Sequence, residues 1–293
     1  MGLSWQQGPL GRNPNGQFLV PGMPERVLYA EPLRRRMHVE LAGRTVVSSD
    51  HAVLLFEPGR YPVAYFPLSD FTQGMLTPSE HRTTHPQLGD TAWFEVCNPR
   101  RRAARAAWQH VALPEHAVIL EGKAALAWAT MDGFYEEDER ILGHAADPYH
   151  RIDTRRSSRH LIVRVGEHIV ANTRSPIVLY ESGFAPRWYV PRADVDADAL
   201  TLTSLQTFCP YKGIASYYTI DGAKNAAWSY RAPLESMAVI GDLVSFEPDR
   251  VEVTIDGERL DLEPGQNVVS HGVDRNLDVG EAGTLTATRE GAG

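Results

Sequence analysis

Cys209 and Lys212 are the residues whose types and spacing most clearly allow covalent chemistry. Cys209 precedes a proline and stands four residues before Gly213, which predicts a place at the mouth of a tight turn between strands. A nearby ammonium group lowers the pKa of a thiol and favours the nucleophilic thiolate, so the pair could form a catalytic centre. Alternatively, Cys209 is a small buried apolar residue, the usual role of an unpaired cysteine. The residue types leave both interpretations open.

Candidate binding residues surround this pair in the sequence. Glu181 and Arg187 flank a glycine–proline turn, where they either position a polar ligand or form an ion pair that holds the turn. Aromatic residues nearby would suit the wall of a pocket for a flat ligand, although aromatic residues in strands most often pack in a core. The aromatic candidates are Tyr189, Tyr211, Tyr217, Trp228 and Tyr230, of which we except Tyr211 from the packing interpretation.

No metal site is predicted. Residues 194–198 offer alternate carboxylates that Mg²⁺ could use, but no further liganding glutamate or glycine turn follows, which favours an acidic surface loop. Asp194 itself stays among the candidate substrate-binding residues. His81 and His85 have helical ligand spacing, but the threonines and proline around them disfavour a helix and no third ligand follows. The cofactor is left unknown.

The elements that must position these residues occur twice. Residues 46–70 match residues 170–194 at a constant offset of 124, as from Glu57 to Glu181, and the match continues through 83–89 and 207–213. The first copy then gains four residues, after which Trp108 matches Trp228 at an offset of 120. We therefore predict two tandem copies of one domain that share a strand order.

Within each copy, short alternating segments separated by turn signals predict a mainly β, antiparallel fold with one short helix. The expected hairpins include 161–171 and the strand that stops at Asp221-Gly222, and the helix is expected at 233–240. The predicted organisation is an N-terminal extension (1–33), a first, degenerate copy (34–142), a linker (143–157), a second copy (158–265) and a C-terminal tail (266–293).

Three motifs of the second copy, in this order, resemble a known family. They are Glu181-Ser182-Gly183 with 186–194, then Cys209-Pro210-Tyr211-Lys212-Gly213, then Ala227-Trp228-Ser229-Tyr230. Together they are similar to Domain of Unknown Function 427. The resemblance implies a compact, tent-like antiparallel β fold. The family also carries a nucleotidyltransferase-type name, but the sequence contains neither G-x-x-x-x-G-K-[ST] nor G-x-G-x-x-G.

Composition excludes several classes of protein. The chain holds 29 basic and 37 acidic residues and two cysteines, which disfavours nucleic-acid binding and a disulfide framework. The arginine run 100–102 with Arg105 could bind phosphate, although a solvated loop is preferred. Apolar runs are short and no secretory signal is evident, so we expect a cytoplasmic protein that makes no contact with a membrane.

Two functions fit these observations. The first is an enzyme that acts on a small polar or nucleotide-like molecule through Cys209 and Lys212, and the second is a non-catalytic small-ligand-binding or assembly module. We expect a pocket in the second copy where Glu181, Arg187 and the Cys209–Lys212 turn meet. His85, Gln87 and Leu88 replace Cys209, Tyr211 and Lys212 in the first copy, so that copy is expected to be structural and to pair with the second.

Overall fold

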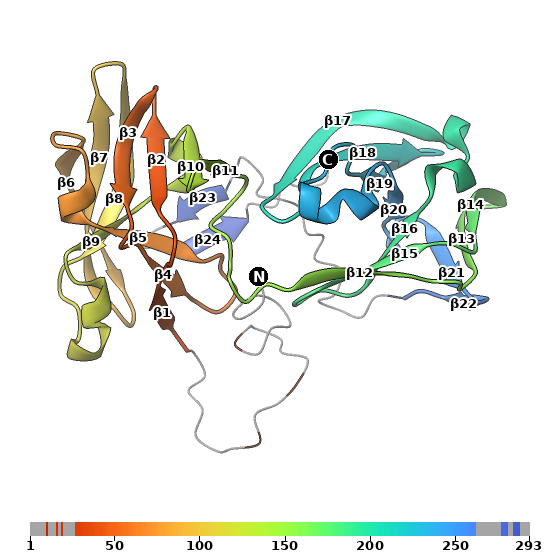
Figure 1. The fold of residues 1–293 in the computed structure, drawn as a ribbon, viewed down its shortest axis with the longest axis horizontal. Coiled ribbons are helices and arrows are strands. Elements are labelled where there is room, and N and C mark those ends of the chain that lie inside the picture. The colour runs from red at the N-terminus through yellow and green to blue at the C-terminus, as the bar shows by residue number, and fades with distance from the viewer. Residues whose placement is uncertain are drawn as a thin grey trace. The chain divides into compact units, whose positions relative to one another are not determined.

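The computed structural model describes residues 27–261, 277–280 and 284–287, together with positions 10, 16 and 19. The chain forms two compact units and passes from one to the other between Asp147 and Pro148. This point lies inside the expected linker, and each unit holds one copy of the repeat (Figure 1).

The first copy consists of a large and a small antiparallel sheet. In spatial order, the large sheet contains β1 (Tyr29–Pro32), β4 (Val53–Phe56), β5 (Val63–Pro67), β9 (Lys123–Leu126), β8 (Arg101–His110), β7 (Gly89–Asn98) and β6 (Leu76–His85). The small sheet contains β11 (Glu139–Ile141), β10 (Gly133–Glu136), β2 (Met37–Leu41) and β3 (Arg44–Ser49).

The second copy repeats this topology strand for strand. Its large sheet contains β12 (Ile152–Arg156), β15 (Ile177–Glu181), β16 (Arg187–Val190), β20 (Val244–Phe246), β19 (Ala223–Ser229), β18 (Gly213–Ile220) and β17 (Leu200–Cys209). Its small sheet contains β14 (His168–Thr173), β13 (Leu161–Val165), β21 (Glu252–Ile255) and β22 (Glu258–Arg259). Each strand corresponds to the strand eleven places earlier, which confirms the predicted shared strand order.

Alternation along the strands gives the large sheet two buried faces. On β16, Trp188 and Val190 pack in the cluster shared with the small sheet, whereas Arg187 and Tyr189 point the opposite way. The second face packs against a short helix, and we call it the η6 face. Its apolar members are Ile177, Leu179, Tyr189, Ala215, Tyr217, Trp228, Tyr230, Met237 and Ile240.

The expected short helix is present in both copies as a 3-10 helix. It is η2 (Glu115–Leu120) in the first copy and η6 (Glu235–Ile240) in the second. Each is six residues long, and η6 is interrupted by a kink at Met237 (φ −115°, ψ 18°), which agrees with the usual shortness of regular 3-10 turns. The remaining helical turns of the described chain are η1 (Leu68–Asp70), η3 (Trp128–Thr130), η4 (Arg192–Asp194) and η5 (Ala197–Ala199).

The sheets extend beyond the boundaries that the sequence alignment gave. β1 precedes residue 34, and β12 lies within the segment 143–157, each pairing along the edge of its large sheet. β12 carries an aspartate and two arginines among its five residues, so the alternation that marks a strand is hidden there. In the expected tail, β23 (Leu277–Gly280) pairs with β24 (Thr284–Ala287).

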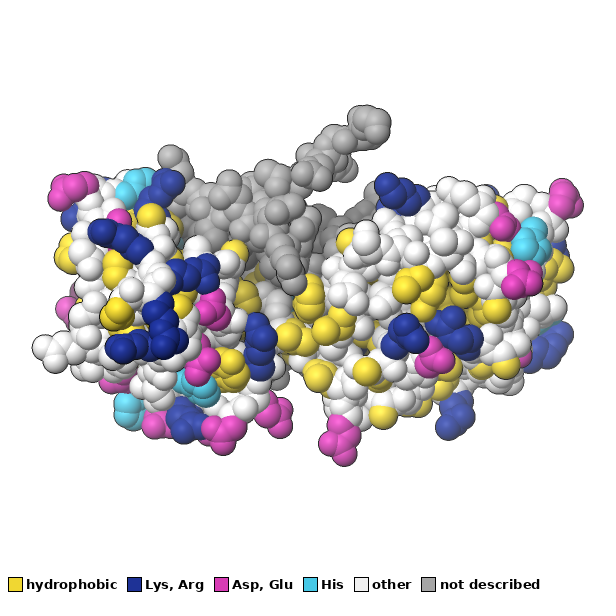
Figure 2. Space-filling view, turned by 90° about the horizontal axis from the view of Figure 1, so that it is seen from above, with side chains coloured by type: hydrophobic (Ala, Val, Ile, Leu, Met, Phe, Trp, Pro, Cys, Tyr) yellow, Lys and Arg dark blue, Asp and Glu magenta, His cyan; other side chains and the backbone are white. Residues whose placement is uncertain are grey.

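The four-residue insertion of the first copy lengthens a hairpin. β7 and β8 each contain ten residues, against eight in β18 and seven in β19. Arg101 pairs with Asp132 at 2.5 Å and Arg102 pairs with Glu95, so the arginine run is partly neutralised. Figure 2 shows the same intermixing of basic and acidic side chains on both halves. None of the helices in the described part of the chain is long and apolar enough to cross a membrane.

Candidate functional site

The Cys209–Gly213 segment is the turn between β17 and β18, as predicted. Cys209 pairs with Gly213 across the hairpin, and Gly213 has a φ of +99°, a conformation that side-chain-bearing residues rarely adopt. The backbone N–H groups of Tyr211 and Lys212 donate to the sulfur of Cys209. The turn therefore directs Lys212 inward, where its side chain is 2 % exposed.

Lys212 forms a buried ion pair with Glu181 at the end of β15. The other carboxylate oxygen of Glu181, Oε1, lies 3.1 Å from Nε2 of His150. Burial opposes the charged carboxylate, but Lys212 and His150 together lower the pKa of Glu181 to about 2. Burial likewise opposes the ammonium, but Glu181 holds the pKa of Lys212 above its usual value. Lys212 is therefore a charged partner of Glu181 and is poorly suited to act as a base.

His150 belongs to this cluster although the sequence analysis did not select it. Its ring stacks on Tyr211, with centroids 4.0 Å apart, and its Nδ1 atom is buried without a hydrogen-bond partner. His150 lies in the segment expected to be a linker, so no motif drew attention to it. Only its proximity to Glu181 in the folded chain reveals it.

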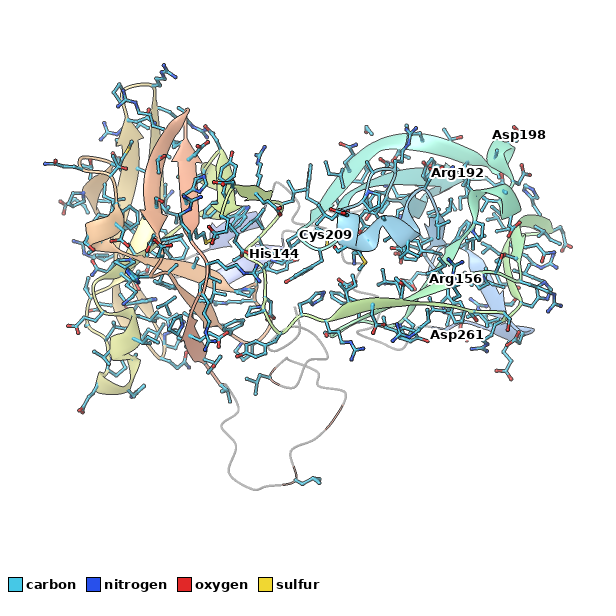
Figure 3. The ribbon with its side chains drawn as sticks, viewed as in Figure 1. His144, Arg156, Arg192, Asp198, Cys209 and Asp261 are labelled. Atoms are coloured by element: carbon cyan, nitrogen blue, oxygen red, sulfur yellow. The ribbon has the colours of Figure 1, made fainter. Side chains whose placement is uncertain are left out.

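Cys209 is buried at the end of β17 (Figure 3). The pKa of its thiol therefore differs from what the sequence predicts. Burial raises the pKa of Cys209, and neither the charge of Lys212 nor the two backbone N–H donors reverse the shift. Lys212 does act to lower the pKa of the thiol, as expected, but burial outweighs it and Glu181 opposes it, so the expected net lowering is not found. The catalytic role assigned to Cys209 stays a prediction without this support.

We expect a thiol reagent applied to the native protein at neutral pH to modify Cys97 at least about tenfold faster than Cys209, because the half-buried Cys97 is the more accessible thiol. Mass mapping of labelled peptides over time measures both rates. In a Cys97→Ser variant, Cys209 should resist labelling until denaturant is added. Rapid native labelling of that variant, with an apparent pKa below about 8.5, would contradict the buried assignment.

Arg187 does not form an ion pair with Glu181, so the two residues do not hold the glycine–proline turn together in that way. Its guanidinium lies over the Trp228 ring, 5.6 Å from the centroid, and its Nη1 atom is 4.0 Å from Oε2 of Glu247. Glu247 follows β20 and is 2 % exposed, and burial raises its pKa although Arg187 opposes the shift. Glu247 lies outside the recognised motifs, so no sequence signal indicates its role.

The aromatic candidates on the η6 face pack in the core and also line the cluster of charged residues. Trp228 Nε1 donates to the hydroxyl of Tyr189 at 3.3 Å, and the hydroxyl of Tyr217 lies 3.1 Å from Thr207 Oγ1. Burial raises the pKa of Tyr189 to about 12 and that of Tyr230 well above its usual value. These residues pack on the η6 face with their polar ends toward the charged groups, so packing and a polar lining coexist there.

Asp194 lies apart from this cluster. It accepts a 2.6 Å hydrogen bond from Thr173 of β14, in the small sheet. The acidic segment that contains Asp194 and Asp198 precedes β17, whereas Cys209 is the last residue of β17, so the length of this strand separates Asp198 from Cys209 (Figure 3). Asp196 caps η5 by accepting from the Asp198 N–H at 3.0 Å. No group of three or more candidate metal ligands occurs among the described residues.

We expect His168 to titrate above about 6.5, because it bridges two loops through carboxylates. Its Nδ1 lies 2.6 Å from Asp221 and its Nε2 3.0 Å from Asp196, and these hydrogen bonds raise its pKa. The linkage adds stability below the unfolded-state pKa and is lost as the pH rises through the folded value. An NMR titration of the ring measures this, and Asp221→Asn should lower the midpoint; an unchanged midpoint in that variant would contradict the bridge.

The first copy keeps the scaffold bonds of the second. Trp108 Nε1 donates to Tyr65 at 3.1 Å, as Trp228 does to Tyr189. Ser49 donates to Asp70 at 2.6 Å, the same bond that links Thr173 to Asp194. Because Asp70 and Asp194 make the same bond in both copies, this aspartate position has a structural role.

The charges of the first copy are rearranged. Leu88 stands at the position of Lys212, and Arg60 binds Glu57 at 2.9 Å instead. His85 stands at the position of Cys209, with Nε2 3.0 Å from Glu57. Its Nδ1 accepts from the N–H groups of Gln87 and Leu88, at 3.2 and 3.1 Å. His85 thus accepts from the same two turn positions as Cys209, which indicates that both residues cap this turn.

The capping role predicts the outcome of substitutions at Cys209. Cys209→Ser should fold with nearly unchanged stability because a hydroxyl oxygen still accepts a hydrogen bond. Cys209→Val should lose about 1–3 kcal/mol of the free energy of unfolding, because it leaves buried donors without an acceptor. Denaturant unfolding of both variants measures the difference. Equal stability of the two variants would show that the thiol serves only as an apolar group.

The structure brings most of the predicted site residues together, but mainly in the interior. Glu181, Lys212 and Cys209 interact electrostatically and all three are buried, and Arg187 lies on the same η6 face. An open hollow touches this cluster only at Glu181. Its other lining residues are Arg151, Asp153, Arg155, Tyr180, Ser182 and Phe184. The motifs therefore meet in the fold, as expected. The open hollow, however, lies beside them and is not lined by Arg187, Cys209 or Lys212.

These features define a tandem of two antiparallel β domains, each with a buried carboxylate beside a hairpin turn on one face of its large sheet. The chain belongs to the family described as Domain of unknown function (DUF427), with the short name NTP_transf_9, whose profile matches residues 29–137 and 153–257. A comparison with curated proteins finds no match.

Proposed function

We propose that the second copy binds a small polar molecule on its η6 face and that the first copy is a scaffold. The observation that carries the proposal is a pair of buried polar atoms without partners, Glu247 Oε1 and Ser245 Oγ. Leaving a buried polar atom without a hydrogen bond costs about 1–3 kcal/mol, and more for a charged group, so two such atoms side by side call for an explanation, and a bound polar molecule would supply their partners.

The first copy supplies the comparison that separates structure from function. At the offsets of the alignment, Ala125 and Ala127 replace Ser245 and Glu247, and Val63 replaces Arg187. All three belong to or pack against the apolar cluster of the first copy. The same fold is therefore built without these polar groups, and their presence in the second copy supports a ligand-binding role.

Native mass spectrometry of the gently purified full chain tests this proposal. We expect a small molecule that is retained by the native protein and released on unfolding. The control is a variant with Arg187→Val, Ser245→Ala and Glu247→Ala, which carries the first copy's residues. A wild-type protein that shows only the mass of its sequence, and that gains no thermal stability from any small polar compound screened, would contradict the proposal.

An enzyme that acts on a small polar molecule is the second candidate, and one observation favours it. Glu181 holds Nε2 of His150 while Nδ1 is buried without a partner, the arrangement of a carboxylate that orients a general base. In this version His150 acts as a general base, and the nucleophilic role first given to Cys209 is not needed. Conversion of the retained molecule by wild type, and its unchanged binding without conversion by His150→Asn, would favour this candidate over simple binding.

A further inference from the structure

We propose that Arg187, Ser245 and Glu247 form a subsite for an uncharged head group that presents a hydrogen-bond acceptor beside a donor, as a primary carboxamide does. The inference rests on the proposed function and names the chemical class of its ligand. It concerns the part of the η6 face formed by β16 and β20, next to the Lys212–Glu181 ion pair, because Arg187 lies opposite Leu179, two residues before Glu181.

The three residues lie on one face of two paired strands. Tyr189 is directly opposite Ser245, so the side chains of these residues share the η6 face. Arg187 stands two residues before Tyr189, and Glu247 stands two residues after Ser245. Because side chains two residues apart along a strand point the same way, Arg187 and Glu247 also face the η6 side. The 4.0 Å separation of Arg187 Nη1 and Glu247 Oε2 agrees with this placement.

The groups face each other without satisfying each other. A distance of 4.0 Å exceeds that of a hydrogen bond, and both Glu247 Oε1 and Ser245 Oγ have no partner. The guanidinium presents only donors, and an ionised carboxylate presents only acceptors. A ligand that forms hydrogen bonds with both side chains must offer an acceptor to Arg187 and a donor to Glu247. The hydroxyl of Ser245 can donate to the ligand's acceptor or accept from its donor.

Charge narrows the class further. Arg187 and Glu247 are 7 % and 2 % exposed, so a ligand charge would be desolvated beside them. An anionic head group would meet the carboxylate of Glu247, and a cationic one would meet the guanidinium of Arg187. Because the opposed charges of the pair cancel, a neutral head group with both functions fits best. The rings of Trp228 and Tyr217 belong to the same face, and the guanidinium of Arg187 lies over the Trp228 ring, so the subsite borders on aromatic side chains.

Three probes of one shape test the inference: benzamide, benzoate and benzamidinium share a phenyl ring and differ in head-group charge. Binding to the full chain is measured by saturation-transfer NMR and competition at neutral pH. We expect wild type to bind benzamide at least about tenfold more tightly than either charged probe. The variant with Arg187→Val, Ser245→Ala and Glu247→Ala should bind benzamide at least about tenfold more weakly than wild type.

The triple variant is expected to fold, because the first copy has these residues at the same positions, where Ala125 and Ala127 are buried and Val63 is partly buried, and because apolar replacement of a buried ion pair is often neutral or stabilising. Its thermal unfolding is the control. Equal benzamide binding by wild type and variant, stronger binding of a charged probe, or no binding of any probe would each overturn the inference. A co-purified molecule retained by the triple variant would overturn this subsite and leave small-molecule binding by the second copy intact. If the wild-type protein retains no co-purified molecule and binds none of the probes, both the subsite and small-molecule binding by the second copy are wrong.

Discussion

Replacing Lys212 with leucine is expected to lower the free energy of unfolding of the second copy by about 3–5 kcal/mol, the usual effect of leaving one member of a buried ion pair unpaired. Glu181 would keep its hydrogen bond to His150 but lose the ammonium that compensates its burial. Denaturant unfolding followed by residue-resolved hydrogen exchange assigns the loss to the second copy. Lys224→Leu, at an exposed position, is the matched control and should stay within about 0.5 kcal/mol.

The first copy suggests how to rescue this variant. Its Arg60 binds Glu57 from the position that Phe184 occupies in the second copy, and Leu88 occupies the position of Lys212. Adding Phe184→Arg to Lys212→Leu should therefore restore most of the lost stability by supplying the cation from the turn between β15 and β16. A double variant no more stable than Lys212→Leu would show that the two copies do not share this exchangeable ion pair.

Acidification is expected to destabilise the first copy through His110. Burial, reinforced by the nearby His85, lowers the pKa of His110 to about 4, and its ring nitrogens are bonded to Tyr65 and Thr91 at 3.0 Å. Because the unfolded chain binds the proton more readily, stability is present above about pH 6.5 and falls as the pH drops toward about 4. The difference of about 2.5 pKa units corresponds to roughly 3 kcal/mol.

Hydrogen exchange across this pH range, with His110→Gln as the comparison, isolates the contribution. Glutamine keeps a donor and an acceptor but does not titrate, so the difference between the proteins should shrink as the pH falls. The second copy offers an internal control, because Tyr230 stands at this position and its pKa is raised well above 10. A pH-independent difference between wild type and His110→Gln would refute the buried neutral histidine.

The repeat and its strand order were predictable because their signals are local. Apolar alternation on strands such as β13 and turn glycines such as Gly213 recur at fixed offsets, and each constrains only its immediate neighbours. The edge strand β12 escaped prediction because its charged residues obscure the alternation. The hairpin place of Cys209 was also local, since a cysteine and a glycine four residues apart pair across one tight turn.

The chemistry of the site depended on the tertiary structure, because electrostatics follows burial and partners distant in the chain. The sequence placed Cys209 close to Lys212, but only the fold buries the thiol, which raises its pKa, and joins Lys212 to Glu181, whose charge opposes the effect of the ammonium on the thiol. His150 and Glu247 lie outside the recognised motifs, and only the folded chain brings them to Glu181 and Arg187. The sequence by itself determined two copies of one β domain and the turns that carry the motifs. The tertiary structure decided which charges are paired, which thiol is buried and which polar atoms remain unsatisfied, because each of these depends on side chains brought together from separate strands.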